Sequence, residues 1–201
     1  MAGLVLAKEP ANLAPHKAEI RAYVKSGEYE RDIAAVAATA GTWLEQRVKQ
    51  GGGKLAIVFD LDETLLSNWE EIDRRDLGME RTAFAAWFNA TKCPAIEPVR
   101  EVYRVARTLG VEVVFLTGRP ERFRAATEKN LQAIGCGEFA KLICKPNDFQ
   151  GTMEKYKSAE RAQLEAGGVV IIANLGDQES DLAGGHAERT FKLPNPFYIS
   201  P

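Results

Sequence analysis

Acidic residues gather where two apolar runs of the sequence end. Asp60, Asp62 and Glu63 directly follow one run, and Asp177 and Asp181 follow another. Three acids within four positions cannot all be ionised at low cost in a buried crevice unless a cation is present. Two carboxylates at a spacing of two residues point the same way along an extended chain. The pattern therefore predicts a crevice in which carboxylates surround a bound cation.

Hydroxyl, glycine and lysine residues accompany these acids. Thr117 and Gly118 follow a third apolar run, and Lys157 lies in the helical pattern that precedes the last long run. A glycine at the start of a helix exposes backbone N–H groups, and the helix N-terminus attracts anions. The sequence therefore predicts an anion site near the acids. Lys157 is the expected cation there, with Lys145 and Lys155 as alternatives.

Short apolar runs must position these groups as strands. The strong runs span residues 55–59, 111–116 and 169–173, and weaker ones span 140–144 and 189–192. Helical patterns occupy residues 98–109, 121–134 and 153–166. Almost wholly apolar runs are typical of strands buried on both faces of a parallel sheet. The alternation predicts an α/β fold with helices on both faces, whose ligands bind at the carboxyl ends of the strands.

The N-terminal part of the chain is helical in character. Residues 17–50 are predicted to form helices, and Ser26-Gly27 separates two of them. Apolar residues recur at helical spacing in the second helix, at Ile33, Val36, Ala37, Ala40 and Leu44. This periodicity indicates one buried stripe along that helix.

Residues 68–97 are predicted to form an insert after the first strand. The segment is longer than an ordinary strand-to-helix connection and carries its own helical pattern at about 81–91. Its aromatic residues are Trp69, Phe84, Trp87 and Phe88. Most of them are expected to form a small core, and Trp69, the nearest to the acidic motif, is expected to line a substrate pocket. We interpret residues 1–201 as one domain with this insert as a small cap.

Four separated motifs resemble those of the haloacid dehalogenase (HAD) superfamily. In order, they are Asp60-Leu61-Asp62-Glu63-Thr64, Leu116-Thr117-Gly118-Arg119-Pro120, Lys157 and Gly176-Asp177-Gln178-Glu179-Ser180-Asp181. Further segments of the chain resemble the class B/IIIB acid phosphatase branch of this superfamily, which includes plant vegetative storage proteins. These segments are Ser26-Gly27-Glu28-Tyr29, Asp62-Glu63-Thr64-Leu65-Leu66-Ser67-Asn68, Tyr156-Lys157-Ser158 and Arg189-Thr190-Phe191-Lys192-Leu193-Pro194-Asn195-Pro196. The resemblance begins at about Ala22. It implies a Rossmann-like three-layer sandwich with a mostly parallel central sheet.

The resemblance implies hydrolysis of phosphate monoesters through a phosphorylated aspartate. Asp60 would attack phosphorus, because splitting this very slow reaction into two displacements lowers its barrier. Asp62 would protonate the leaving oxygen and then take a proton from the water that hydrolyses the intermediate. The expected substrates are small soluble esters such as nucleotides, sugar phosphates or aryl phosphates.

The resemblance also implies a magnesium ion, which prefers octahedral oxygen ligands. Its expected ligands are Asp60, the backbone carbonyl of Asp62, Asp177, a phosphate oxygen and water molecules. Asp181 is expected to hold one of those water molecules.

The phosphoryl group has its own expected partners. Thr117 and the backbone N–H of Gly118 would bind the phosphoryl oxygens, and Lys157 would balance their charge.

Two other functions stay open on the sequence alone. A phosphorylated Asp60 can pass its phosphoryl group to an alcohol, which would make the chain a phosphotransferase or mutase. A storage or binding protein without catalysis is the alternative from another class, since the resembled branch includes members in which the nucleophile is replaced. The presence of Asp60 with every other motif residue argues against such a loss.

The charge of the chain excludes some partners. The formal net charge of −2 and the pI of about 5.8 leave no overall cationic field to gather nucleic acid or anionic lipid. Acidic residues interrupt the local cluster of Arg119, Arg122 and Arg124, which we interpret as a solvated helix face. No apolar run approaches the roughly 18–20 residues of a membrane span. We expect neither a nucleic-acid polymer nor a membrane span.

The cysteines and the N-terminus bear on localisation. Cys93, Cys136 and Cys144 are too few for a complete disulfide framework and are interpreted as reduced and partly buried, although one pair could bridge in an oxidising compartment.

The apolar segment Met1–Ala7 is too short for the apolar region of a signal peptide. The resemblance implies a periplasmic or secreted protein, with a cytoplasmic one as the alternative. The sequence leaves a homo-oligomer open.

Overall fold

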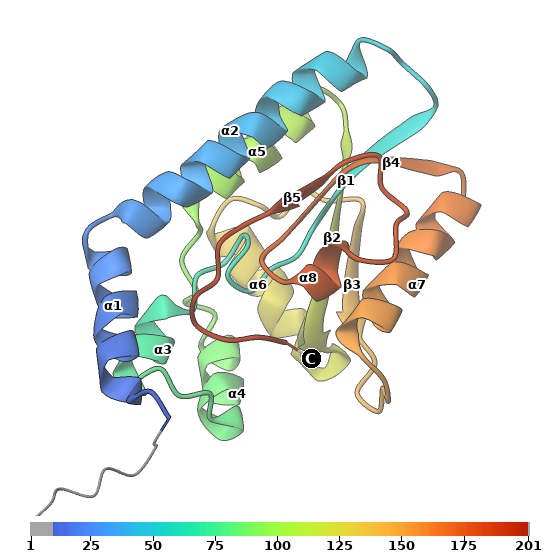
Figure 1. The fold of residues 1–201 in the computed structure, drawn as a ribbon. Helices are drawn as coiled ribbons and strands as arrows, with labels where there is room; N and C mark the ends of the chain where they lie inside the picture. Colours follow the sequence, from blue (N-terminus) through green and yellow to red (C-terminus); the bar gives the residue numbers. More distant parts are fainter. Residues whose placement is uncertain (1–9, 201) are drawn as a thin grey trace, which may run out of the picture.

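A five-stranded sheet runs through the middle of the molecule (Figure 1). The computed structural model describes residues 10–200, so the segment Met1–Ala7 lies outside the described residues. The strands are β1 (Lys54–Phe59), β2 (Glu112–Pro120), β3 (Lys141–Lys145), β4 (Val169–Gly176) and β5 (Thr190–Lys192). Their order across the sheet is β3-β2-β1-β4-β5, and each neighbouring pair is parallel. The predicted strands and parallel sheet are confirmed.

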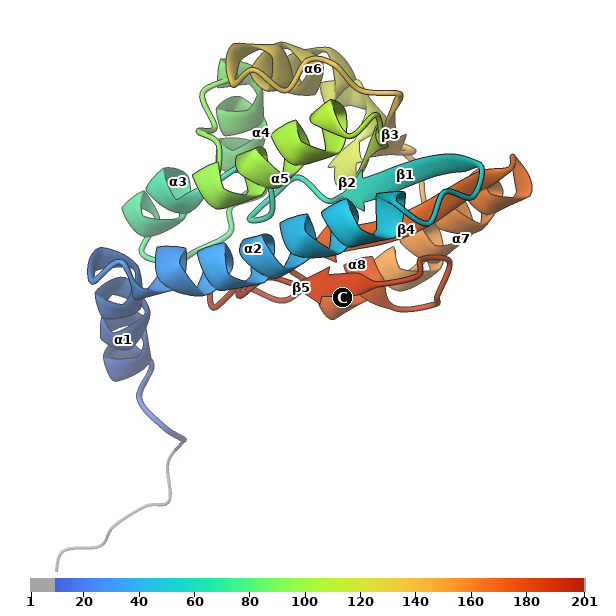
Figure 2. The same cartoon turned by 90° about the horizontal axis from the view of Figure 1, so that it is seen from above.

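Helices cover both faces of the sheet. They are α1 (Leu13–Lys25), α2 (Glu28–Val48), α3 (Trp69–Arg74), α4 (Arg81–Ala90), α5 (Glu97–Thr108), the 3-10 helix η1 (Glu121–Phe123), α6 (Arg124–Ala133), α7 (Met153–Ala166) and α8 (Glu179–Leu182). Helices α2 and α5 lie side by side over one face, and α7 packs on the other (Figure 2). The predicted three-layer α/β fold is therefore confirmed.

Two apolar clusters fill the space between the sheet and its helices. Side chains of β1 alternate between the clusters, because successive residues of a strand point to opposite faces. Ile57 and Phe59 join the cluster under α2 and α5, whereas Ala56 and Val58 join the cluster under α7. Both faces of β1 are thus buried, which explains why its sequence is almost continuously apolar.

The long helix α2 docks on the sheet by the predicted stripe. Its start is set by Gly27, which has a φ of 73° in the left-handed region that glycine adopts at little cost. The break predicted at Ser26-Gly27 is therefore confirmed. On α2, the buried residues of the stripe are Ile33, Ala37, Ala40 and Leu44, and Val36 is partly buried.

Strand β2 is longer than its apolar pattern predicts. It continues to Pro120, which pairs with Lys145 of β3 after a shift in register beyond Thr117. The helix predicted at 121–134 starts with the turn η1 and becomes α-helical only in α6. Thr117 and Gly118 therefore lie in extended backbone and not at a helix start, because pairing with β3 prolongs the strand.

The insert between β1 and α5 contains two helices, of which the sequence pattern predicts only α4. Helix α3 is six residues long, too short to show a helical period in the sequence. Ile72 of α3 and Phe84 and Trp87 of α4 are buried, and α4 packs beside α6. The insert thus stands next to the carboxyl end of β2.

The three cysteines, Cys93, Cys136 and Cys144, are free thiols in buried positions. This agrees with the interpretation of reduced thiols and shows no bridge between them. Within residues 10–200, no helix combines the length and the apolar character that a membrane span requires.

The buried stripe of α2 can be tested by removing one side chain. Leu44 is fully buried against the sheet, so its truncation leaves a cavity. We expect Leu44→Ala to lower the free energy of unfolding by about 2–5 kcal/mol, measured by urea denaturation. Glu45→Ala, a change at the exposed neighbouring residue, should alter it by less than about 0.5 kcal/mol. Equal effects of the two changes would contradict this packing.

Candidate active site

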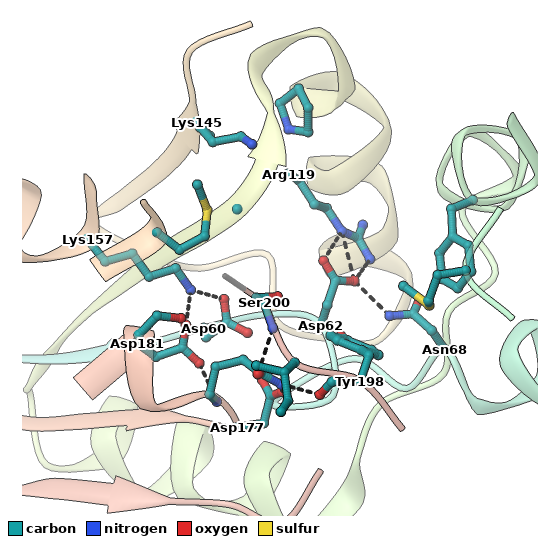
Figure 3. A pocket seen from close by; sticks show the side chains of 18 of the residues that line it. Asp60, Asp62, Asn68, Arg119, Lys145, Lys157, Asp177, Asp181, Tyr198 and Ser200 are labelled. Atoms are coloured by element: carbon teal, nitrogen blue, oxygen red, sulfur yellow. Dashed lines mark hydrogen bonds and ion pairs between the residues drawn. The ribbon is translucent and has the colours of Figure 1, made fainter. Parts of the chain in front are cut away.

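The acids predicted to meet at the sheet edge do lie together. Strands β2, β1 and β4 are neighbours and parallel, so their carboxyl ends point to the same edge. Asp60 follows β1, Asp177 follows β4 and Gly118 lies near the end of β2. All three line one cavity of about 540 Å³, together with Asp62 and Lys157 (Figure 3).

A buried lysine bonds to two of the carboxylates. Lys157 of α7 donates from Nζ to Oδ1 of Asp60 and to Oδ1 of Asp181 (Figure 3). Lys157 as a whole is only 4% exposed. Burial works to lower the pKa of Lys157, but the charges of Asp60 and Asp181 outweigh it and raise that pKa. Lys157 is therefore charged, and the alternative cations Lys145 and Lys155 do not occupy this position.

The carboxylate cluster suits a divalent cation. One oxygen from each of Asp60, Asp177 and Asp181 lies within 4.8 Å of the others. Burial raises the pKa of Asp60 well above its usual range, opposed by Lys157 and assisted by the neighbouring carboxylates. Burial and the charge of Asp181 likewise raise the pKa of Asp177. A hard cation with oxygen ligands would offset this repulsion, so the donor set fits a divalent cation of that kind.

Asp177 is fixed by hydrogen bonds from three sides. Thr64 Oγ1 donates to Asp177 Oδ1 at 3.0 Å. The side-chain amides of Gln178 and Asn195 donate to Asp177 Oδ2 at 2.6 and 2.7 Å. These donors favour the ionised carboxylate and set its orientation, as partners of metal ligands do.

Asp181 is held by the short helix α8. The backbone N–H of Gln178 donates to Asp181 Oδ2 at 2.8 Å, so Asp181 caps its own helix and bonds to Lys157 with its other oxygen. A Cβ on Gly176 would lie 2.3 Å from Cβ of Asp181, which explains the glycine at this close approach. Arg161 of α7 is fully buried and donates to the backbone carbonyl of Asp181 at 2.6 Å. Arg161 is not predicted from the sequence, because one arginine in a polar helix carries no distinguishing signal.

Arg119 contradicts the interpretation of a solvated helix face. It is 2% exposed, and its guanidinium donates from Nη2 to Asp62 Oδ1 at 2.6 Å and from Nε to Asp62 Oδ2 at 3.0 Å. It also lies 4.1 Å from the centre of the Phe88 ring. The physical reason is that β2 continues through Arg119, so the alternation of a strand turns this side chain inward. Arg122 and Arg124, beyond the strand, fit the predicted surface better.

Asp62 is consequently held as a carboxylate. Asn68 Nδ2 adds a hydrogen bond to its Oδ1 at 2.8 Å. Burial works to raise the pKa of Asp62, but the Arg119 guanidinium outweighs burial and keeps this pKa below its usual range. The two acids of the motif therefore differ, because Asp60 has a raised pKa and Asp62 a lowered one.

Glu63 ties the motif to the C-terminal segment. Its carboxylate is 1% exposed and accepts hydrogen bonds from the backbone N–H of Asn68 at 2.6 Å and from Tyr198 Oη at 2.5 Å. Burial, followed by the charge of Asp62, raises the pKa of Glu63 to about 8. Tyr198 and Ser200 line the cavity, so the end of the described chain forms one of its walls.

Trp69 and Thr117 are placed differently from their expected roles. Trp69 packs against Phe197 with ring centres 5.1 Å apart, and it is not among the residues that line the cavity. The insert contributes Phe84 and Phe88 to the cavity wall instead. The side chain of Thr117 is fully buried behind Gly118, and its Oγ1 accepts a hydrogen bond from the backbone N–H of Arg119 at 3.1 Å.

A protein-family model matches residues 5–201 of the chain. The model describes HAD superfamily, subfamily IIIB (acid phosphatase). Acid phosphatase 1 of Solanum lycopersicum is 35% identical over 202 residues, which cover 94% of this chain and 79% of that protein. Vegetative storage protein 1 of Arabidopsis thaliana is 32% identical over 197 residues, covering 96% of this chain and 72% of that protein.

A solved structure shares the fold. The class C acid phosphatase from Bacillus anthracis, in a crystal structure with tungstate bound, superposes with a TM-score of 0.75. It is 21% identical in sequence, and the match covers 92% of this chain and 86% of that one. At this identity the likeness shows the arrangement of strands and helices.

The effect of Arg119 on Asp62 can be measured directly. Arg119→Met removes the guanidinium charge and keeps an apolar chain against Phe88. Because burial of Asp62 is then no longer offset, we expect its pKa to rise in a carboxyl-carbon NMR titration. Arg122→Met, at an exposed neighbouring position, should leave that pKa unchanged. An unchanged pKa of Asp62 in Arg119→Met would contradict the assigned cause.

Proposed function

The chain belongs to subfamily IIIB of the HAD superfamily, the acid phosphatases, and we propose that it hydrolyses small phosphate monoesters through a phosphoaspartate on Asp60. As a member of this family it is a phosphomonoesterase. The observation that supports this mechanism is the position of Asp60 and its hydrogen bond to Lys157. Asp60 Oδ1 accepts a hydrogen bond from Lys157, and the residue faces the cavity beside Asp177 and Asp181.

In the first step Asp60 attacks phosphorus with one carboxylate oxygen. A bond forms between this oxygen and phosphorus, and the bond from phosphorus to the leaving oxygen breaks. Lys157 fixes the other carboxylate oxygen, so the attacking oxygen is oriented before the substrate arrives. Asp62 donates a proton to the leaving oxygen, which departs as an alcohol.

In the second step water attacks the phosphoaspartate. Asp62 accepts a proton from this water, the bond between phosphorus and the Asp60 oxygen breaks, and phosphate and the free carboxylate are regenerated. The ionised state of Asp62 beside Arg119 suits this step. The first step requires Asp62 to take up a proton against the charge of Arg119, which an acidic medium favours.

Backbone and side-chain donors would hold the phosphoryl group. Gly118 lines the cavity, and its N–H would bind a phosphoryl oxygen, while the buried hydroxyl of Thr117 would support the same stretch of β2. The charge of Lys157 would balance that of the phosphate. For Trp69, contact with the leaving group is the weaker proposal, since Phe84 and Phe88 form the nearer wall.

We propose Mg²⁺ as the cation of the carboxylate cluster. Asp60, Asp177 and the backbone carbonyl of Asp62 would hold it, and Asp181 would hold one of its water molecules. When bound, the ion supplies positive charge to the phosphoryl oxygens.

A non-catalytic storage protein is the second candidate. The observation in its favour is the set of relatives described as vegetative storage proteins 1 and 2 of Arabidopsis thaliana, at 32% and 31% identity. The complete carboxylate cluster around Lys157 favours the enzyme, since a storage role needs no such site.

An extracytoplasmic location is our proposal for this chain. It rests on relatives such as the stem 28 kDa glycoprotein of Glycine max, 35% identical over 183 residues, because glycosylated chains pass through the secretory route.

The nucleophile is tested by replacing Asp60. With Mg²⁺ present, we expect the wild type to release p-nitrophenol from p-nitrophenyl phosphate, and Asp60→Asn to be slower by at least about a thousandfold because the amide cannot form the phosphoaspartate. EDTA should abolish turnover by the wild type. Asp148→Asn, a change at an exposed acid outside the cavity, should leave the rate unchanged.

Two results would contradict the proposed function. Full activity of Asp60→Asn would remove the phosphoaspartate mechanism. No turnover by the wild type between about pH 4 and 8, with several metals and a panel of nucleotides, would contradict the phosphatase and favour the storage or binding protein.

The metal ligands are tested by Asp177→Asn. Asp177 is the most fully hydrogen-bonded carboxylate of the cluster, so the change removes charge with little change in shape. We expect the Mg²⁺ concentration for half-maximal activity to rise by at least about tenfold, the loss that even an outer-shell partner causes. The control is again Asp148→Asn. An unchanged Mg²⁺ dependence would exclude Asp177 as a ligand.

A further inference from the structure

Lys145 is a cation of the cavity that the mechanism does not use. It is the last residue of β3, it is half-buried, and it lines the same cavity as Asp60 and Lys157. Figure 3 shows its side chain pointing into the pocket from the side away from Asp177. The other two cations of the cavity are bonded to carboxylates, Lys157 to Asp60 and Asp181, and Arg119 to Asp62. Within residues 10–200, no carboxylate is paired with Lys145.

The surroundings of Lys145 add positive charge and no negative charge. Burial, and then the charges of Arg122 and Arg81, lower the pKa of Lys145, so both guanidinium groups act on its ammonium. Neither arginine has an acidic partner within the described residues. Of these three cations only Lys145 lines the cavity, and an anion bound to it there would relieve the repulsion that the two arginines exert on its ammonium.

Apolar side chains line the same cavity as Lys145 and Asp60. They are Met79, Phe84, Phe88, Met153 and Ile199. Met79 and Ile199 are 50% and 89% exposed, unusual for such large apolar side chains. Such a wall suits an apolar or aromatic part of a ligand and carries no group to bind an anion. Lys145 thus offers a positive charge, in the same cavity as Asp60, to a ligand that also has an apolar part.

We propose that Lys145 forms a second anion subsite, so that the preferred substrates are phosphate monoesters whose apolar leaving group carries a further carboxylate or phosphate. This inference rests on the proposed hydrolysis at Asp60 and names the class of leaving group. The reacting phosphate lies at Asp60, Gly118 and Lys157, and the second anionic group lies at Lys145.

The sheet sets the spacing between the two groups. Strand β2 lies between β1 and β3, and neighbouring strands are about 4.8 Å apart, so the ends of β1 and β3 are separated by roughly 10 Å. The side chains of Asp60 and Lys145 both reach into this gap. A benzene ring with a phosphate ester at one end and a carboxylate at the other has the length to bridge it.

A different role for Lys145 would be to bind the reacting phosphate itself. The strand register argues against this, since Lys145 pairs with Pro120, which lies past Gly118 along β2. In that role the loss of Lys145 would slow every substrate by the same factor. In the proposed role it slows only those with a second anionic group.

The test compares phenyl phosphate with 4-carboxyphenyl phosphate and with 4-(phosphonomethyl)phenyl phosphate, whose phosphonate cannot be hydrolysed. We expect Lys145→Gln to lower kcat/KM for both anionic esters by about tenfold, chiefly through KM, and for phenyl phosphate by less than about twofold. Comparing each variant with the wild type cancels the intrinsic reactivity of the leaving groups. A loss for only one ester would identify carboxylate or phosphate as the preferred group.

Two further variants make the test specific. Lys145→Glu should reverse the preference and favour 4-(aminomethyl)phenyl phosphate, whose leaving group is cationic. Lys155→Gln, which removes an exposed lysine outside the cavity, should leave all ratios unchanged.

The outcomes separate this inference from the proposed function. Turnover of phenyl phosphate with equal losses for all esters in Lys145→Gln would overturn the second subsite and leave the phosphatase intact. No turnover of any ester by the wild type would overturn both.

Discussion

The bond of buried Lys157 to Asp60 and Asp181 is the constraint on which the rest of the site depends. Carboxylates at the ends of β1 and β4 repel one another in a dry crevice, and without a cation they would protonate or move apart. Lys157 holds two of them at once and is itself held by their charge. Breaking such a buried pair by removing one partner costs about 3–5 kcal/mol. The bond between Lys157 and Asp60, the proposed nucleophile, therefore also contributes to the stability of the fold.

A second cation divides the roles of two neighbouring acids. Asp60 and Asp62 are separated by one residue, yet the environment raises the pKa of Asp60 and lowers that of Asp62. Burial acts on both, and the difference comes from Arg119, whose guanidinium bonds to both oxygens of Asp62. In the proposed mechanism Asp62 both gives and takes a proton, and Arg119 would stabilise its carboxylate and make its protonation dependent on pH.

Segments far apart in the sequence complete the site. The C-terminal residues Asn195 and Tyr198 bond to Asp177 and Glu63, which follow β4 and β1. The insert contributes Asn68, which donates to Asp62, and the apolar wall. The carboxyl ends of parallel strands thus hold most of the charged groups, and the insert and the C-terminal segment form further parts of the cavity wall.

The sequence by itself determined the strands, the parallel sheet, the buried stripe of α2 and the grouping of Asp60, Asp177 and Asp181 at one edge, because each follows from local period and from strand direction. Only the tertiary structure decided the partners of those groups. The sequence pattern around Arg119 indicates a charged surface, but β2 extends through this residue and its side chain points toward Asp62. Trp69 is nearest to the acids in sequence, yet it packs on Phe197, and Phe84 and Phe88 reach the cavity. Such contacts depend on register and helix placement, which a one-dimensional pattern does not contain.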